Sequence, residues 1–462
     1  MDMPTGRKRV LVFCRNYLVE IFRKGAEPLA DKFDFRFLTD GVCSGTRDTR
    51  RAFYAALALG ARSAEITPED EDDVVARCRL LRNIDRAQAS KLVHAMAVTL
   101  GDEIDRTRPD VVLSQMVDEY VTHILGLLAQ KRGLGYVAYC WSYFPGRAFV
   151  LADPYGRPFR WRQASDEEVA EDLARISDVR YRRNYNQSDQ YRWSKHLFRM
   201  AREHVKTVVH LVRGKIERDP WNLHYRVMPY CAAQRRFRDF PRRALFDADW
   251  SAKLSALKAR RPNAPVVYLP LAYVPESTTD YWITDRRAAD YDRIVPRMIR
   301  ELARGCIVVV KEHAHMMGKR DGRLLEEIAS MPDVVSVHPT ESSNAVADAA
   351  DAIVLGAGSA GVEAAVRGKP VFSFCGTSYW FDVSGATLLE LDRMEGWSEA
   401  ISASLAGWTP MEAPAQHEFL RTCLASTVRS RTESGVWPQI DEDDLAAVLS
   451  IAVARAHPVA AR

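Results

Sequence analysis

Residues Ala352–Phe374 read A-I-V-L-G-A-G-S-A-G-V-E-A-A-V-R-G-K-P-V-F-S-F. An apolar run, a glycine-rich turn, a short helical segment and a second apolar run predict a strand–turn–helix–strand unit. Glycines after a strand let the backbone approach a ligand closely, and free N–H groups at a helix start attract phosphate. The alternative is a purely structural glycine turn. The predicted ligand contacts are Gly356, Gly358, the hydroxyl of Ser359, Ala360 and the carboxylate of Glu363.

Residues 263–390, which include this turn, alternate between short apolar runs and amphipathic segments. Such alternation is typical of a doubly wound, mainly parallel sheet, in which ligands bind beyond the carboxyl ends of the strands. We therefore predict a Rossmann-like domain over 263–390. Its expected strands are Val266–Leu269, Cys306–Val310, Val334–Val337, Ala352–Leu355 and Pro370–Phe374, and its expected helices are Tyr291–Arg304, Arg323–Ser330 and Ser342–Ala349.

Residues 1–160 show the same alternation less regularly, which predicts a second Rossmann-like domain. Near the end of this domain, the glycine- and proline-containing stretch 145–158 predicts a loop. The expected strands are Arg9–Cys14, Phe33–Leu38, Val111–Ser114 and Tyr136–Tyr139, and the expected helices are Val19–Ala30, Asp70–Thr107 and Tyr120–Lys131.

The segment 161–262 differs from both, because it is rich in arginine and aromatic residues and has helical stretches such as Asp189–Arg218. It predicts a helical insertion or connector, which either contacts an anionic glycan or a membrane surface or is simply a solvated connector. Residues 391–462 are expected to form C-terminal helices that return to the N-terminal domain.

Bulk properties set limits on the function. The chain has 462 residues and a formal net charge of +4, so nothing global indicates nucleic acid as a partner. Its eight cysteines are scattered without zinc spacing, and several lie in apolar runs, which indicates a reducing compartment. Neither a signal peptide nor an apolar run long enough to span a bilayer is recognisable. These features predict a cytoplasmic protein whose membrane contact, if any, is peripheral at the inner face.

A second polar motif, Lys311-Glu312-His313-Ala314-His315, follows the predicted strand Cys306–Val310. A cation and two imidazoles at a strand's carboxyl end could balance the charge that develops on a leaving phosphate. We expect Lys311 and His315 to bind the ligand and His313 to act in catalysis. A partly exposed polar loop is the alternative. A third loop, after Val266–Leu269, presents Glu276 and Ser277 at the same edge.

These three loops carry a resemblance. Pro275-Glu276-Ser277-Thr278-Thr279, then Lys311-x-His313, then Gly358-Ser359-x-Gly361-x-Glu363-Ala364 with Gly368-Lys369-Pro370-Val371, resembles the capsule polysaccharide biosynthesis family. That family is similar to bacterial sialyltransferases and includes transferases of 3-deoxy-manno-octulosonic acid (Kdo). The resemblance implies a GT-B fold, with two Rossmann-like domains facing a central crevice, and a nucleotide-activated sugar, often a CMP-sugar, on the C-terminal domain. It also implies phosphate contacts for His313 and Ser359 and a ribose-side position for Glu363. Ala314 replaces the family's usual proline, while a literal His338-Pro339 occurs one strand later.

The N-terminal domain offers a candidate base. Asp118 and Glu119 fall between a predicted strand end and a helix start, where a carboxylate could deprotonate an acceptor hydroxyl or simply stabilise the helix dipole. Arg15, Asn16 and Asp40 also follow strands and are expected on the acceptor side.

Together these features predict a nucleotide-sugar-dependent glycosyltransferase acting on a capsule or other surface polysaccharide or its lipid-linked precursor. Neither a metal nor another cofactor is required, because helix dipoles, His313 and Ser359 can stabilise the departing phosphate. A nucleotide-sugar 2-epimerase of the same fold and a non-catalytic polysaccharide-assembly protein are the alternatives. The choice between Asp118 and Glu119, and between an inverting and a retaining course, stays open.

Overall fold

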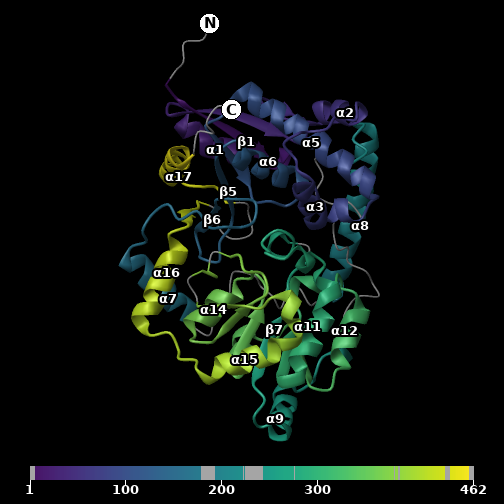
Figure 1. Ribbon diagram of the computed structural model, residues 1–462, viewed down its shortest axis with the longest axis vertical. Helices are drawn as coiled ribbons and strands as arrows, with labels where there is room; N and C mark the ends of the chain where they lie inside the picture. The colour runs from purple at the N-terminus through teal and green to yellow at the C-terminus, as the bar shows by residue number, and fades with distance from the viewer. Residues whose placement is uncertain are drawn as a thin grey trace. The chain divides into compact units, whose positions relative to one another are not determined.

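The computed structural model describes residues 6–177, 193–221, 223, 243–274, 276–378, 380–382, 385–431 and 438–456. The chain divides into two compact units, each assembled from separate segments of sequence. Unit 1 consists of Met1–Gln163, His210–Cys231 and Leu424–Arg462, and unit 2 consists of Ala164–Val209 and Ala232–Cys423. Each unit contains one large sheet with helices packed against it (Figure 1).

The sheet of unit 1 has the strand order β13-β6-β5-β4-β1-β2-β3. The strands from β5 to β3 in that order are parallel, and β6 and β13 extend the sheet in antiparallel fashion at one edge. The strand bounds are β1 Lys8–Cys14, β2 Phe33–Thr39, β3 Arg47–Asp48, β4 Val111–Gln115, β5 Gly135–Trp141, β6 Arg147–Leu151 and β13 Thr427–Arg429.

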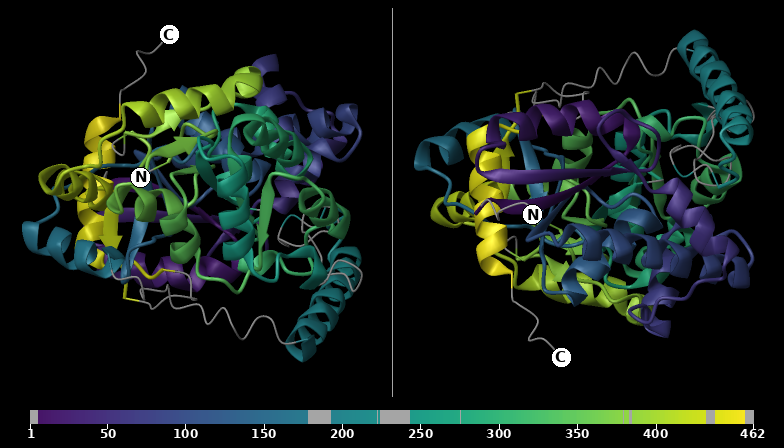
Figure 2. Two further views of the ribbon diagram at one scale, coloured as in Figure 1. Left: turned by 90° about the horizontal axis from the view of Figure 1, so that it is seen from below. Right: turned by 90° about the horizontal axis from the view of Figure 1, so that it is seen from above.

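Helices cover both faces of this sheet. Because side chains alternate along a strand, Val10, Val12 and Cys14 of β1 share one face, where they pack with α1 and with the C-terminal helix α17. The right-hand view of Figure 2 shows the strands of this unit between α1 on one side and the blue helices α5 and α6 on the other. The helix bounds are α1 Val19–Ala26, α2 Arg50–Ala58, α3 Pro68–Arg77, α4 Arg79–Arg82, α5 Arg86–Thr107, α6 Tyr120–Lys131 and α17 Glu442–Arg455.

One sequence prediction for this unit was wrong, and two were incomplete. The single helix expected over Asp70–Thr107 is three helices, because Cys78 is extended (φ −82°, ψ 121°) and the Asp85 side chain caps a new helix start. The expected loop 145–158 contains β6, whose apolar residues are buried between β5 and β13. The residues after Glu390, expected to be helical, also contain β13.

The sheet of unit 2 has six strands, all parallel, in the order β12-β11-β10-β7-β8-β9. The strand bounds are β7 Val266–Pro270, β8 Ile307–Lys311, β9 Val334–Val337, β10 Ala352–Leu355, β11 Val371–Ser373 and β12 Thr387–Leu388. The helix bounds are α7 Asp166–Ser177, α9 Trp250–Arg260, α10 Ser277–Asp280, α11 Tyr291–Gly305, α12 Gly322–Ala329, α13 Ser343–Ala349, α14 Ala360–Val366, α15 Trp397–Ala406 and α16 Ala413–Leu424. Helix α8, Trp193–Ile216, crosses the division, since its residues up to Val209 belong to unit 2 and the rest to unit 1.

Both sheets reverse their winding direction once. In unit 1 the chain moves from β1 outward to β2 and β3 and then returns to the other side of β1 with β4. In unit 2 it moves from β7 to β8 and β9 and then returns beside β7 with β10. This confirms the predicted α/β fold with two Rossmann-like domains, and it marks one topological switch point in each sheet, where ligands of open α/β sheets bind.

The segments 1–160 and 263–390 each lie within one unit, whereas 161–262 and 391–462 each contribute to both. About half of the arginines and aromatic residues that distinguish 161–262 in the sequence fall in 178–192 and 224–242, which lie outside the described residues. Among the described helices, none is both long enough and apolar enough to cross a membrane.

Candidate functional site

The glycine turn of unit 2 follows β10, directly at the switch point between β7 and β10. Packing requires one of its glycines and constrains a second. A Cβ on Gly361 would lie 2.4 Å from the buried indole ring of Trp380, whose Nε1 donates to the Gly358 carbonyl (3.1 Å). A Cβ on Gly356 would lie 3.0 Å from the Cys375 sulfur. The spacing of these two glycines therefore reflects the fold of the turn.

Gly358 differs from its neighbours, since a Cβ there would meet no atom closer than 3.9 Å, a methyl of Leu355. Gly358, Ser359 and Ala360 are all partly exposed, and Ser359 makes no side-chain cap to α14. The open side of the turn thus presents the backbone at 358–360 together with a hydroxyl, which are groups suited to a phosphate.

A buried polar cluster lies beneath this edge. The Lys311 ammonium, at the end of β8, donates to the Ser343 hydroxyl at the start of α13 (3.2 Å). Burial lowers the pKa of Lys311 to about 8, and the nearby carboxylates of Glu312, Glu341 and Glu363 partly offset that shift. Burial raises the pKa of Tyr268, which also faces Ser343 and Glu363. The structure thus brings Glu363 of the glycine turn and Lys311 of the second motif to one location.

The loop after β8 is held by a buried arginine. The Arg320 guanidinium, fully buried, donates to Glu312 Oε2 (2.6 Å), to the Ala272 carbonyl after β7 (2.5 Å) and to Asp292. The other oxygen of Glu312 accepts the amide of His313 (2.5 Å). Burial raises the pKa of Glu312, although Arg320 opposes that shift. Arg320 and Glu312 therefore fix the loops after β7 and β8 against each other.

This support orients the imidazole of His313. Its Nδ1 accepts the amide hydrogen of His315 (3.1 Å). A ring nitrogen that accepts a hydrogen bond carries no proton, so the neutral ring holds its proton on Nε2 as a donor. The Tyr273 ring lies 5.5 Å from the His313 ring and 6.2 Å from the His315 ring, and the Tyr273 hydroxyl accepts from Lys319 (3.1 Å). Two imidazoles, a phenol and an ammonium are thus grouped beside the switch point.

The third predicted loop contributes differently. Glu276 is exposed at the start of α10 and accepts from the Thr278 hydroxyl (2.7 Å), whereas Ser277 is buried, with 5% of its surface exposed. Its backbone carbonyl accepts the amides of Tyr281 and Trp282. The position of Ser277 is therefore that of a helix-forming residue, and Glu276 has the more open side chain.

Unit 1 carries a charge cluster at its own switch point, between β1 and β4. The Arg15 guanidinium, 1% exposed, pairs with Asp40 Oδ2 (2.5 Å), Asp118 Oδ1 (3.2 Å) and Glu119 Oε2 (3.0 Å). The three carboxylates come from the loops after β2 and β4, which the parallel sheet brings to one edge. Asn16 joins through its backbone amide, which donates to Asp40 Oδ1 (3.0 Å). The cluster unites all five residues predicted for the acceptor side.

Three acidic groups around one guanidinium leave an excess of negative charge. Burial, together with the charges of Asp118 and Asp40, raises the pKa of Glu119 to about 7, although Arg15 opposes the shift. Burial likewise raises the pKa of Asp40. The Glu119 side chain is 15% exposed, against 7% for Asp118 and 1% for Asp40. Glu119 is thus the most accessible of the three and exchanges its proton near neutral pH.

Neighbouring polar groups hold Asp118 in place. Its Oδ2 accepts from Gln115 Nε2 (2.8 Å), and its backbone amide donates to the Thr122 hydroxyl of α6 (3.2 Å). Arg15 also donates to the carbonyl of Leu223, a buried residue in the segment after α8 (2.8 Å). Asp118 therefore belongs to the scaffold of the cluster, while Glu119 is the less enclosed of the two.

Several of these residues were not among the predicted site residues. Arg320 and Lys319 lie outside the predicted motifs and join the unit 2 site only through tertiary contacts, whereas Gln115 and Thr122 lie within four residues of Asp118 in sequence. Tyr273 comes three residues after β7, so its position just beyond a strand was an available signal. Metal binding finds no support in the described part of the chain, where no three His, Cys, Asp or Glu side chains are grouped to hold an ion.

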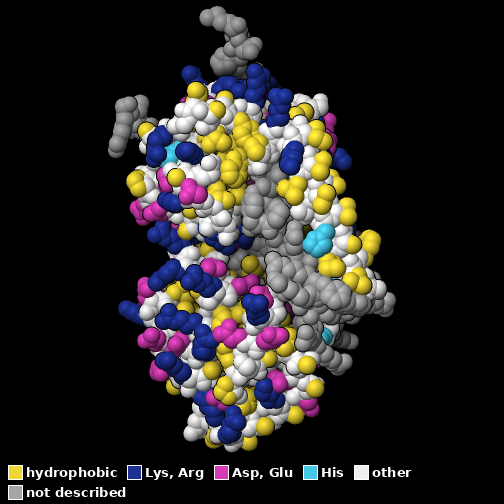
Figure 3. Space-filling view, turned by 90° about the vertical axis from the view of Figure 1, so that its right-hand side faces the viewer, with side chains coloured by type: hydrophobic (Ala, Val, Ile, Leu, Met, Phe, Trp, Pro, Cys, Tyr) yellow, Lys and Arg dark blue, Asp and Glu magenta, His cyan; other side chains and the backbone are white. Residues whose placement is uncertain are grey.

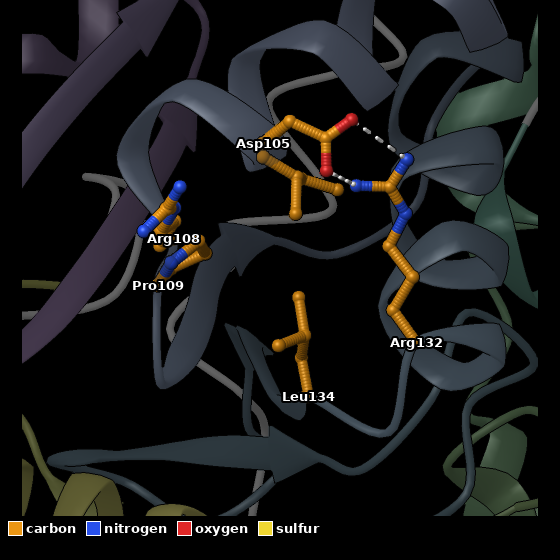
Figure 4. A pocket seen from close by; sticks show the side chains of 6 residues that line it. Asp105, Arg108, Pro109, Arg132 and Leu134 are labelled. Atoms are coloured by element: carbon orange, nitrogen blue, oxygen red, sulfur yellow. Dashed lines mark hydrogen bonds and ion pairs between the residues drawn. The ribbon is translucent and has the colours of Figure 1, made fainter. Parts of the chain in front are cut away.

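A separate pocket of about 360 Å³ lies in unit 1, lined by Ile104, Asp105, Arg108, Pro109, Arg132 and Leu134 (Figure 4). It lies where β4 and β5 begin. The Arg15 cluster lies at the carboxyl ends of the strands, so the pocket is at the opposite end of the sheet. Figure 4 shows Arg132 turned toward Asp105, to which it is paired (2.8 Å), and Glu65 also pairs with it (2.6 Å). The pocket contains none of the predicted site residues.

No family model matches the chain, and no curated protein matches it by sequence. Solved structures with a similar fold include the UDP-GlcNAc 2-epimerase of Neisseria meningitidis bound to UDP-GlcNAc. The two sequences are 14% identical, the match covers 91% of this chain and 97% of that chain, and the TM-score is 0.29. They also include the β-Kdo 2,7-transferase of KpsC from Thermosulfurimonas dismutans, with 9% identity, 96% and 99% coverage, and a TM-score of 0.35. Its β-Kdo 2,4-transferase matches with 12% identity, 75% and 87% coverage, and a TM-score of 0.31. At such low TM-scores, the function must be argued from this chain's own residues.

Proposed function

We propose that this protein is a nucleotide-sugar-dependent glycosyltransferase, with the donor on the switch-point edge of unit 2 and the acceptor on that of unit 1. The observation that carries the proposal is the opposite chemistry of the two edges. Unit 2 has an ammonium, imidazoles and an open glycine turn, which suit an anionic nucleotide. Unit 1 has excess carboxylates, which suit proton removal from a hydroxyl.

On the donor side, each group has a distinct task. The backbone at 358–360 and the Ser359 hydroxyl bind phosphate, and His313 donates through Nε2 to the same group. Lys311 adds positive charge, His315 adds a second imidazole, and Glu363 accepts from the ribose. As the sugar–phosphate bond breaks, these donors stabilise the charge that develops on the departing nucleotide.

On the acceptor side, Glu119 acts as general base. A base is most effective when its pKa lies near the working pH, and the Arg15 cluster brings Glu119 to that range. Glu119 takes the proton of the acceptor hydroxyl as its oxygen attacks the anomeric carbon. Direct attack from the face opposite the leaving nucleotide inverts the configuration at that carbon. Asp118 and Asp40 hold Arg15, and Arg15 orients Glu119.

The proposed donor is a CMP-activated sugar such as Kdo, on the basis of the resemblance to the capsule polysaccharide family. The proposed acceptor is a surface polysaccharide or its lipid-linked precursor. UDP- and GDP-sugars are the competing donors, and the open turn at Gly358 would accept the phosphates of any of the three.

Nucleotide binding tests the donor site. We expect CMP, UDP or GDP at millimolar concentration to raise the thermal unfolding midpoint of the purified chain, because a ligand that binds only the folded state stabilises it by mass action. H313A and S359A should lose most of the shift. The matched control is H338A, which removes the histidine of the literal His-Pro pair, a side chain that packs against Phe246 (5.0 Å between rings). No shift with any nucleotide, or a shift lost only in H338A, would contradict the donor site.

Product analysis then separates the alternatives. A transferase releases nucleotide in proportion to acceptor and makes a new glycosidic bond. A 2-epimerase converts free nucleotide-sugar without acceptor, and a non-catalytic assembly protein binds glycan without turnover. Epimerisation without acceptor, undiminished in E119Q, would replace the transferase proposal.

A further inference from the structure

Helix α8 exposes apolar side chains and buries polar ones, which is the reverse of the usual arrangement. Its apolar side chains point to solvent, with exposed fractions of 68% for Phe198, 62% for Val205 and 75% for Ile216. Its buried positions include His196 and Thr207, which are polar. In Figure 3 hydrophobic side chains gather along the right-hand margin of the face shown, where α8 lies. A helix of a globular protein ordinarily buries its apolar side, so this arrangement calls for an external contact.

The exposed residues form one continuous stripe. Starting from Phe198, successive members follow after seven, four, three and four positions. At 100° per residue, this spacing places all of them within about 60° of each other around the helix axis. Val208 extends the stripe on one side. The members of the stripe are Phe198, Val205, Val209, Val212 and Ile216.

Basic residues flank this stripe. Arg202 and Lys206 lie on one side of it and Lys215 on the other, and all three are exposed. The helix sequence Trp193–Ile216 contains a single acidic residue, Glu203, which is on the opposite, partly buried side. An apolar stripe bordered by cations is the pattern of a helix that lies in the plane of a membrane surface.

We propose that α8 is a membrane-docking helix, which inserts its apolar stripe among the lipids of an anionic bilayer while its basic flanks contact the headgroups. Charge complementarity favours this occupant over a second copy of the chain. Two α8 helices packed through their stripes would bring Arg202, Lys206 and Lys215 of both copies together, and like charges at such a seam repel. Anionic headgroups instead attract the same residues.

Vesicle sedimentation with the full chain tests the proposal. We expect the protein to bind vesicles of phosphatidylcholine with 30% phosphatidylglycerol at low salt, and at least 10-fold less to pure phosphatidylcholine. The double variant V205Q and V212Q should lose binding at least 10-fold. The double variant R202Q and K206Q should weaken binding and flatten its salt dependence. These substitutions lie at exposed positions, so the unfolding midpoint should not change.

The matched control is L59Q, which makes the same apolar-to-polar change at a residue that is 84% exposed just after α2. It should bind vesicles like the parent chain. Equal binding by the parent chain and the V205Q and V212Q variant would overturn the proposal, as would the absence of binding to anionic vesicles. A dimer in light scattering that this variant dissociates, without vesicle binding, would assign the stripe to a second copy.

Discussion

At the scale of single residues, the charges of the Arg15 cluster affect both the stability of the fold and the protonation of Glu119. Three carboxylates share one guanidinium, so with all three ionised two negative charges would be left uncompensated in a buried place. Protonation of Glu119, the most exposed of the three, removes one negative charge, and the raised pKa of Glu119 reflects this. A scaffold built for stability alone would not need the third acid.

Replacing Glu119 with glutamine should reduce transfer activity by roughly 10²- to 10⁴-fold, the usual contribution of a general base. In the parent chain, activity should rise with pH through about 7, because the base must be ionised. The variant should lose this limb of the pH profile while its nucleotide-induced thermal shift stays unchanged. D118N is the comparison. It should retain the limb because Glu119 is still present, but at lower pH, since the Asp118 charge that helps raise the Glu119 pKa is gone.

Stability gives the control for this variant. A carboxyl whose folded pKa is raised holds a proton between pH 4.5 and 7 that the unfolded chain has lost, so stability falls as pH rises through that window. Glutamine removes the cost, which amounts to at most about 3 kcal/mol at pH 8. The free energy of unfolding of E119Q at pH 8 should therefore equal or exceed that of the parent chain. A clear loss in urea unfolding would indicate a structural role for Glu119.

At the scale of elements, the turn between β10 and α14 combines packing and binding. Gly361 leaves room for the Trp380 ring, whereas a Cβ on Gly358 would meet no atom closer than 3.9 Å. Glycines at regular spacing therefore look alike in sequence but differ in what surrounds them.

The pair G361A and G358A should separate these tasks. G361A forces a methyl against a fully buried indole and should cost about 1–3 kcal/mol in urea unfolding, the usual cost of overpacking. G358A should keep the stability of the parent chain within about 0.5 kcal/mol and lose nucleotide affinity, because its methyl projects toward the proposed phosphate. Full nucleotide affinity in G358A would remove this turn from the donor site.

At the scale of the whole molecule, the chain returns to unit 1 after completing unit 2. Strand β13 pairs with β6, and α17 buries Leu445, Val448 and Leu449 in the core of the first sheet. The first unit thus depends on the last forty residues or so of the sequence.

A chain ending at Leu424 should therefore lose the folded structure of unit 1. Removing three buried aliphatic side chains costs roughly 2–5 kcal/mol each, which together is comparable to the 5–15 kcal/mol by which domains are usually stable, and the edge strand is lost as well. Limited proteolysis with peptide mapping should show early cleavage within residues 6–163. A chain ending at Ala456 is the control and should resist proteolysis like the parent. Equal resistance in both truncated chains would contradict the dependence of unit 1 on β13 and α17.

The sequence by itself determined the alternating strands and helices of both sheets and the loops that follow them. Parallel sheets bury both faces, so their strands read as apolar runs, and polar residues right after such runs must fall at one edge. This is why Arg15, Asp40 and Glu119 could be named before their contacts were known. The breaks at Cys78 and the strand in 145–158 were missed, because local pattern does not show which partner a short apolar run will find.

Only the tertiary structure decided which of these residues meet. The pairing of Arg15 with three carboxylates depends on the order β2-β1-β4, and the clamp of Arg320 on Glu312 depends on the neighbouring loops after β7 and β8. The roles of Gly361 and the solvent-facing stripe of α8 likewise follow from what packs against each residue. Burial and ion pairing are properties of the folded surroundings, and a sequence lists residues without their neighbours in space.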